Sequence, residues 1–88
     1  MNFIIYDLEA TCWRGRPPHG VNEVIEIGAY KVNQLGEVLG EFNKFIKPTV
    51  NPILSDFCRQ LTSISQNDVD RARTFPLVIQ EFMDWINV

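Results

Sequence analysis

The stretch Phe3-Ile4-Ile5-Tyr6-Asp7-Leu8-Glu9 decides how this chain folds, because it is an apolar run that ends in two carboxylates one residue apart. Such a run is typical of a β-strand covered on both faces. Side chains of a strand alternate between its faces, so Asp7 and Glu9 are expected to share one face. Carboxylates held side by side repel each other, and a cation relieves that repulsion. Carboxylate oxygens suit Mg²⁺ or Mn²⁺, which makes Asp7 and Glu9 candidate metal ligands.

The composition fits one small domain. The chain has 88 residues, of which 45% are apolar, and this is enough for a single modest core. Eight basic and eleven acidic residues give a formal net charge of -3, so no overall basic field attracts a polyanion. If nucleic acid binds, metal ions and local contacts must provide most of the attraction.

The cysteines and the N-terminus predict where the protein resides. Cys12 and Cys58 are too few for a disulfide scaffold and lack metal-site spacing, which indicates two buried thiols in a reducing compartment. The apolar start is interrupted by Asp7 and has no basic segment before it, so it does not read as a signal peptide. No stretch approaches the length of a membrane span. We therefore expect a cytoplasmic protein with no membrane partner.

Three strands are predicted in the first half of the chain. Glycine, proline and basic residues over 10–22 predict a loop after the first strand. β-branched residues predict a second strand over 24–32, and a turn at 33–36 leads into a third over 38–46. Tight connections between consecutive strands indicate an antiparallel meander.

Helices are predicted in the second half. Ser55 is expected to cap a short helix, and Ser65 to begin another brief turn through Asp68 and Val69. Pro76 fits the first turn of a longer helix, in which Phe75, Val78, Ile79, Phe82 and Ile86 fall on one face.

This order of elements leaves the first strand short of a neighbour. Its two-sided apolar pattern calls for partners on both edges, whereas a meander supplies one. A helix after a meander normally leads to a further strand parallel to the first. We therefore expect the front portion of a larger α/β domain, shortened by a mechanism that the sequence does not reveal. The free edge beside Phe3, Ile5 and Tyr6 is expected to make the chain self-associate.

Four segments, in order along the chain, resemble the DEDDh 3′-to-5′ exonucleases, most of all the branch of histone-mRNA and enhanced-RNAi exoribonucleases and their bacterial relatives. A lone Asp-x-Glu is a weak signal, whereas four segments in register are specific. The segments are Asp7-Leu8-Glu9-Ala10-Thr11-Cys12-Trp13, Glu23-Val24-Ile25-Glu26-Ile27-Gly28-Ala29, Phe42-Asn43-Lys44-Phe45-Ile46-Lys47-Pro48 and Phe57-Cys58-x-x-Leu61-Thr62-x-Ile64.

The resemblance implies an RNase H-like fold with a mixed five-stranded sheet, of which residues 1–88 supply the first three antiparallel strands and the following helices. It also implies a single exonuclease domain that hydrolyses single-stranded nucleic acid, with a lean toward RNA, from the 3′ end. Asp7 and Glu9 would be the catalytic pair that binds two ions, Mg²⁺ or Mn²⁺, and Ala10, Thr11 and Trp13 would contact the terminal nucleotide. Two such ions about 3.5 to 4 Å apart activate a water and stabilise the leaving oxygen.

The chain also departs from the family pattern. The second-motif Asp, the third-motif Asp and the general-base His of the family all lie downstream of the segment present here. His19 is the only histidine and does not correspond to that base. Ser63 stands where relatives often have glycine, which is a modest strain if the backbone requires positive φ. Residues 1–88 alone are therefore expected to lack phosphodiesterase activity.

Several residues allow two interpretations. Trp13 either stacks on the terminal base or packs beneath the loop. Arg14, Arg16 and His19 belong to a flap on substrate phosphates or, as we favour, to a solvated loop. Glu26 either supports the metal site indirectly or, as we favour, faces water.

Three functions are compatible with these patterns. The first is a metal-dependent 3′-to-5′ exonuclease. The second is a non-catalytic module derived from a nuclease fold that binds nucleic acid or protein. The third, an integrase-type nuclease, is disfavoured by the match in the second and third strands.

Overall fold

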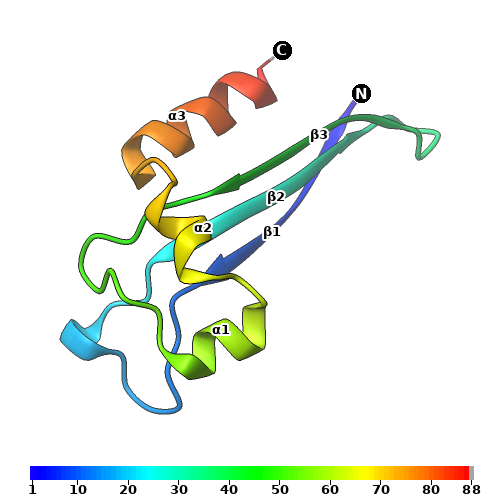
Figure 1. Ribbon diagram of the computed structural model, residues 1–88. Coiled ribbons are helices and arrows are strands. Elements are labelled where there is room, and N and C mark those ends of the chain that lie inside the picture. Colours follow the sequence, from blue (N-terminus) through cyan, green and yellow to red (C-terminus); the bar gives the residue numbers. More distant parts are fainter. Residues whose placement is uncertain (88) are drawn as a thin grey trace.

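A computed structural model describes residues 1–87 and confirms the predicted elements in order and in type. Three strands come first, a short 3-10 turn lies in the loop after the first strand, and three α-helices follow (Figure 1). The elements are β1 (Phe3–Ala10), η1 (Pro18–Gly20), β2 (Val24–Val32), β3 (Val38–Phe45), α1 (Asp56–Thr62), α2 (Gln66–Asp70) and α3 (Phe75–Ile86).

The strands form one antiparallel sheet in the order β1-β2-β3, as the meander predicted. The pairing places residues in rows across the sheet, and residues in one row share a face. Two rows matter for function. They are Asp7–Gly28–Asn43 and Glu9–Glu26–Phe45.

A β-bulge interrupts the pairing of β1 with β2. Glu9 lies opposite Glu26 and Ala10 lies opposite Val24, so Ile25 is one residue in excess. The shift inverts the alternation of side chains along β2, because Ile27 and Ala29 pack with α3 but Ile25, two residues before Ile27, does not. Val24 packs with the residues of α3, whereas the fully buried Ile25 packs with residues of α1 and α2.

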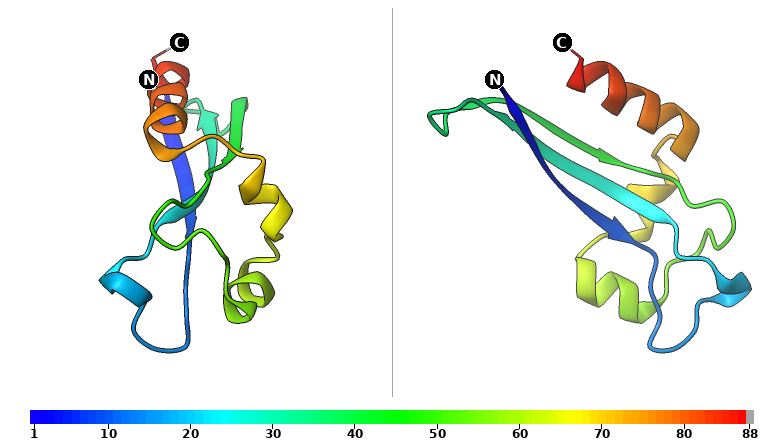
Figure 2. Two further views of the ribbon diagram at one scale, coloured as in Figure 1. Left: turned by 60° about the vertical axis from the view of Figure 1, so that its left-hand side comes forward. Right: turned by 180° about the vertical axis from the view of Figure 1, so that it is seen from behind.

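Helices cover both faces of the sheet (Figure 2, left). α3 lies against one face, and α1 and α2 lie against the other near the end of β1. The two faces have separate apolar clusters. The α3 cluster contains Ile27, Ala29, Phe42, Ile46, Val78 and Phe82, and the second cluster contains Ile25, Leu54, Cys58, Ile64 and Val69.

Aromatic packing fixes α3 on its face of the sheet. The ring of Phe82 lies 5.1 Å from that of Phe42 and 6.0 Å from that of Trp85. Lys31 on β2 donates to the carbonyl of Trp85 at 2.9 Å, and its ammonium group lies 5.0 Å from the indole ring. No helix among residues 1–87 is both long and apolar enough to cross a membrane.

Side-chain caps hold α1 beside the end of β1. The hydroxyl of Ser55 accepts a hydrogen bond from the N–H of Cys58 (3.0 Å) and donates one to the carbonyl of Cys12 (2.6 Å). The predicted N-cap at Ser55 is therefore confirmed, and it also anchors the loop after β1. At the other end of α1, Ser63 has φ 63°, so the condition for a modest strain at this residue, a positive φ without glycine, is met.

β1 is an edge strand among residues 1–87, because β2 is its only partner there. Its apolar side chains are correspondingly exposed: Phe3 by 47%, Ile5 by 59%, Tyr6 by 61% and Leu8 by 45%. These residues lie on both faces of the strand. The edge is therefore an apolar surface with unpaired backbone groups.

Candidate metal centre

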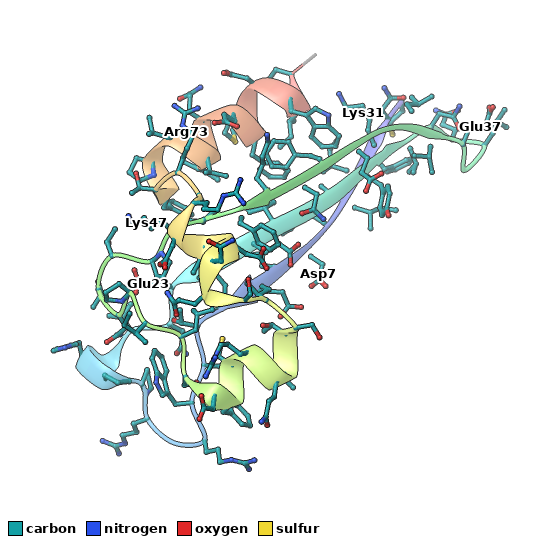
Figure 3. All side chains as sticks on the ribbon, in the orientation of Figure 1. Asp7, Glu23, Lys31, Glu37, Lys47 and Arg73 are labelled. Atoms are coloured by element: carbon teal, nitrogen blue, oxygen red, sulfur yellow. The ribbon has the colours of Figure 1, made fainter. Side chains whose placement is uncertain are left out.

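Asp7 and Glu9 lie on the same face of the sheet, as their spacing predicts. In the rows across the sheet, Asp7 is aligned with Asn43 and Glu9 with Phe45, and both partners face away from α3. Asp7 is exposed beside β1 (Figure 3), and Glu9 is half-buried. One oxygen of Asp7 accepts the N–H of Leu8 at 3.0 Å, which ties this carboxylate to the strand.

An open hollow adjoins Asp7. It measures about 240 Å³, and Ile5, Gly28 and Asn43 contribute to its walls. Gly28 is the register partner of Asp7 and has no side chain to fill the space between Asp7 and Asn43. A group as large as a phosphate can therefore approach the carboxylate from solvent.

Carboxylates are crowded on this face. Glu9 and Glu26 are direct partners across β1 and β2, and like charges in that position destabilise a sheet. The pKa of Glu26 is raised, first by its partial burial and then by the charges of Glu9, Asp68 and Asp7, although a hydrogen bond with Asn43 opposes the shift. Glu26 is half-buried and lies in the same row as Glu9, so it shares the face of the site, and its support of a metal stays a prediction.

No basic side chain relieves this crowding. Among residues 1–87, no lysine or arginine forms an ion pair with any of these four carboxylates, because the ion pairs there are Arg59–Asp56 and Arg73–Glu81. Hard oxygen donors without a counter-charge suit a divalent cation. The set is only part of a centre, however, since no group of three or more His, Cys, Asp or Glu side chains within 1–87 is placed to hold a metal.

The three residues predicted to contact the substrate differ in exposure. Thr11 is only 1% exposed, and its hydroxyl accepts the N–H of Glu23 at 2.8 Å. Its carbonyl accepts from the side chain of Asn22 at 2.7 Å, so Thr11 anchors the loop rather than presenting its side chain. Ala10 and Trp13 are half-buried at the start of the same loop.

The basic residues of the loop fit the solvated interpretation that we favoured. The guanidinium of Arg14 lies 4.9 Å from the ring centre of Phe57 on α1, which is a cation–π contact. Arg16 and His19 are exposed, and His19 has φ 60° within η1. None of the three joins the carboxylates of the site.

Glu23 has a structural role that its sequence context did not reveal. Its carboxylate accepts the N–H groups of Thr49 (2.7 Å), Val50 (3.0 Å) and Asn51 (2.8 Å). Partial burial alone would raise the pKa of Glu23, but these three backbone hydrogen bonds outweigh it and lower the pKa below its usual value. The interaction fixes the segment after β3 against the loop after β1.

Glu23→Gln should destabilise the chain by about 2 kcal/mol at pH 7, because hydrogen bonds to a charged acceptor contribute roughly 1.5 to 3 kcal/mol when buried and less near solvent. A carboxylate with a depressed folded pKa contributes stability above its unfolded pKa and loses it as pH falls through the folded pKa. The difference between the two proteins should therefore shrink below about pH 4.5. Urea unfolding at pH 7 and pH 3 measures it, and an equal difference at both would contradict this role.

Both cysteines are free thiols, as expected. Cys58 is buried and Cys12 is half-buried. Burial raises the pKa of Cys12 to about 11, with further contributions from the Cys58 side chain and from Glu9. At neutral pH Cys12 is therefore a protonated thiol and a poor nucleophile.

Comparison with known proteins identifies the family. Residues 4–88 match the Exonuclease family (RNase_T), and the chain belongs to it. It is 44% identical over 85 residues to the 3′-5′ exoribonuclease 1 of Homo sapiens, covering 96% of this chain and 24% of that protein. It is 40% identical over 84 residues to ERI1 exoribonuclease 2 of Xenopus laevis, covering 94% of this chain and 12% of that protein. The chain thus spans a quarter or less of these relatives.

Solved structures agree with this assignment. The nuclease domain of 3′hExo, a DEDDh family member bound to rAMP, superposes with a TM-score of 0.90 at 42% identity, covering 98% of this chain and 44% of that one. A 3′-exonuclease that recognises the histone mRNA stem-loop gives 0.89 at 41% identity, covering 98% and 39%. The resemblance to DEDDh exonucleases is therefore confirmed, and the three strands and following helices correspond to the N-terminal part of that fold.

Proposed function

We propose that residues 1–88 form the N-terminal portion of a single exonuclease domain that cleaves single-stranded RNA from its 3′ end. The observation that carries this proposal is the pair Asp7 and Glu9 on one open face, crowded by further carboxylates and paired with no basic residue within 1–87. The relatives support it, because the two compared above, at 44% and 40% identity, are exoribonucleases.

In this proposal Asp7 and Glu9 are catalytic residues that hold Mg²⁺ or Mn²⁺. When bound, two such ions activate a water for attack on a phosphodiester and neutralise charge on the leaving oxygen. The protein contributes position: Asp7 is fixed by the N–H of Leu8, and Glu9 is half-buried opposite Glu26. The loop anchored by Thr11 places Ala10 and Trp13 at the end of the same strand, where the terminal nucleotide is proposed to bind.

A hybrid protein tests the whole proposal. This chain replaces the matching segment of the human 3′-5′ exoribonuclease 1, with which it shares 44% identity over 85 residues. We expect the hybrid to shorten a 5′-labelled single-stranded RNA progressively from its 3′ end when Mg²⁺ is present, and to stop when EDTA is added. A folded hybrid that leaves the RNA intact would contradict the proposal. A hybrid that degrades single-stranded DNA equally well would remove the preference for RNA.

A non-catalytic binding module is the second candidate. It is favoured by one observation, namely that residues 1–87 bring together no group of three metal ligands. A hybrid that binds the RNA without shortening it would support this module instead of the exonuclease.

The exposed edge of β1 is proposed to make the chain associate with itself. Four large apolar side chains flank unpaired backbone groups there, which favours pairing with the same edge of a second copy. Sedimentation velocity of the chain should show a dimer or larger species, and Ile5→Lys should shift it toward monomer because a charge on an edge strand opposes pairing.

Leu35→Lys is the matched control for this experiment. Leu35 is 83% exposed but lies in the turn between β2 and β3. The substitution Leu35→Lys should leave the self-association of the chain unchanged. A monodisperse monomer for the unaltered chain, or an equal response to both substitutions, would exclude pairing through β1.

A further inference from the structure

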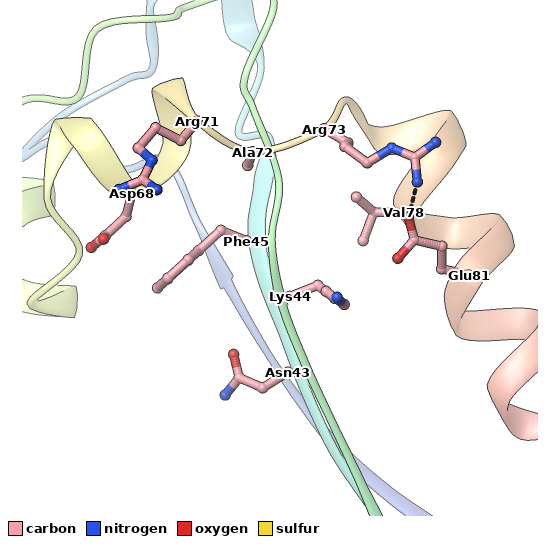
Figure 4. A pocket seen from close by; sticks show the side chains of 9 residues that line it. All are labelled: Asn43, Lys44, Phe45, Asp68, Arg71, Ala72, Arg73, Val78 and Glu81. Atoms are coloured by element: carbon pink, nitrogen blue, oxygen red, sulfur yellow. Dashed lines mark hydrogen bonds and ion pairs between the residues drawn. The ribbon is translucent and has the colours of Figure 1, made fainter.

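A second open site lies on the far side of the sheet from β1, at the outer edge of β3. It is a cleft of about 520 Å³ between β3, α2 and α3 (Figure 4). Its charged residues are Lys44, Arg71, Arg73, Asp68 and Glu81. This cleft is larger than the hollow beside Asp7, and its basic residues take no part in the candidate metal centre.

The free charge of the cleft is positive on balance. Arg73 and Glu81 neutralise each other through an ion pair of 2.5 Å, drawn as a dashed line in Figure 4. Among residues 1–87, neither Lys44 nor Arg71 forms an ion pair, and Asp68 is engaged as the capping partner of Ser65. With three basic and two acidic side chains the cleft has a formal net charge of +1 in an acidic chain, which marks a place for an anion.

The cleft adjoins the face that contains the metal centre. Asn43 lines it and stands in the same row as Asp7, two strand spacings or about 10 Å across the sheet. Asp68 also belongs to both places, since its charge acts on Glu26. Phe45 adds a half-buried aromatic ring between α2 and the sheet, at the cleft wall (Figure 4).

We propose that this cleft binds backbone phosphates of the nucleic-acid strand, upstream of the end that reaches Asp7 and Glu9. The inference rests on the proposed function, because it names where the rest of the substrate lies. Lys44 and Arg71 supply the charge, and Asn43 and Phe45, which also line the cleft, lie on the face of the sheet that contains Asp7. Cations that contact phosphates release counterions, which makes such binding depend on salt.

The test measures binding without metal, so that it is independent of cleavage. The probe is 5′-fluorescein decauridylate, titrated with the 88-residue chain in EDTA over a series of salt concentrations. Lys44→Gln and Arg71→Gln should each lower the affinity roughly threefold to tenfold and reduce the slope of log K against log salt by about 0.7, the value for one phosphate contact on a single strand. Arg71→Lys should retain the slope because it retains the charge.

Lys47→Gln is the control, because it removes the same charge three residues from Lys44 at an exposed position that does not line the cleft. It should leave the slope unchanged. The proposal would be overturned if all three Gln variants lost affinity for decauridylate equally, or if the unaltered chain showed no measurable binding at low salt.

Two further outcomes separate this proposal from its alternatives. The outer edge of β3 also suits an extended acidic peptide. Just beyond this edge, the chain itself pairs in that way, because the N–H of Lys47 donates to the carbonyl of Arg73 at 2.9 Å. Tighter, cleft-dependent binding of decaglutamate than of decauridylate would therefore overturn the nucleic-acid assignment. If the hybrid does not cleave RNA but still binds it through the cleft, only the proposal of exonuclease activity is refuted.

Discussion

Asp7→Asn is expected to abolish cleavage by the hybrid protein, reducing the rate of RNA shortening at least about a thousandfold, which corresponds to roughly 4 kcal/mol of transition-state stabilisation. The substitution keeps the size of the side chain and removes its charge. Asp7 is exposed beside an open hollow and is linked to the protein by one hydrogen bond to the N–H of Leu8, so little structural damage should follow. The loss would therefore report on metal binding rather than on folding.

Asp84→Asn provides the matched comparison. Asp84 lies exposed on α3, where it accepts a hydrogen bond from Gln80 at 2.9 Å. It should leave cleavage unchanged. Calorimetric titration with Mn²⁺ gives a readout apart from activity, because the heat of binding should fall in Asp7→Asn alone. Retention of cleavage by Asp7→Asn would end the assignment of Asp7 as a catalytic residue.

Phe82→Ala is expected to lower the free energy of unfolding of the chain by a large amount. Phe82 is 8% exposed and packs against the rings of Phe42, Trp85 and Tyr6, and truncation of a buried phenylalanine costs roughly 3 to 5 kcal/mol. The free energy of unfolding of an 88-residue domain is about 4 to 13 kcal/mol, at roughly 0.05 to 0.15 kcal/mol per residue. The variant should therefore unfold at a much lower urea concentration than the unaltered chain.

Phe75→Ala is the control for the core prediction. Phe75 is on the same helix but is 44% exposed, so its loss should cost much less. Circular dichroism during urea unfolding compares the two variants at one protein concentration. Similar midpoints for both would show that α3 is not fixed by the Phe82 contacts.

The sequence predicted the fold well because its local signals agree with one another. The pairing of β2 with β3 followed from β-branched runs joined by a short turn, and α1 followed from the N-cap Ser55. The positive φ of Ser63 was considered only as a condition, because the matching segment of relatives often has glycine, and the structure meets that condition. In each case the determining contacts lie within a few residues of one another.

The site could be predicted only in part. Asp7 and Glu9 were found because two residues on one strand share a face by geometry. Glu26 and Asp68 were not assigned to that face, because their proximity depends on the pairing of β1 with β2 and on how α2 packs. Glu23 was missed for the same reason, since its three backbone donors lie more than 25 residues away.

The bulge at Ile25 has a consequence for how this stretch tolerates changes in length. Deletion of one residue between Val24 and Glu26 would restore regular pairing of β1 with β2. Each side chain of the strand beyond the deletion would then point to the opposite face of the sheet. The turn at 33–36 has no such constraint, because its length does not decide which layer β2 faces. Natural insertions and deletions of a single residue should therefore be far rarer at 24–26 than at 33–36.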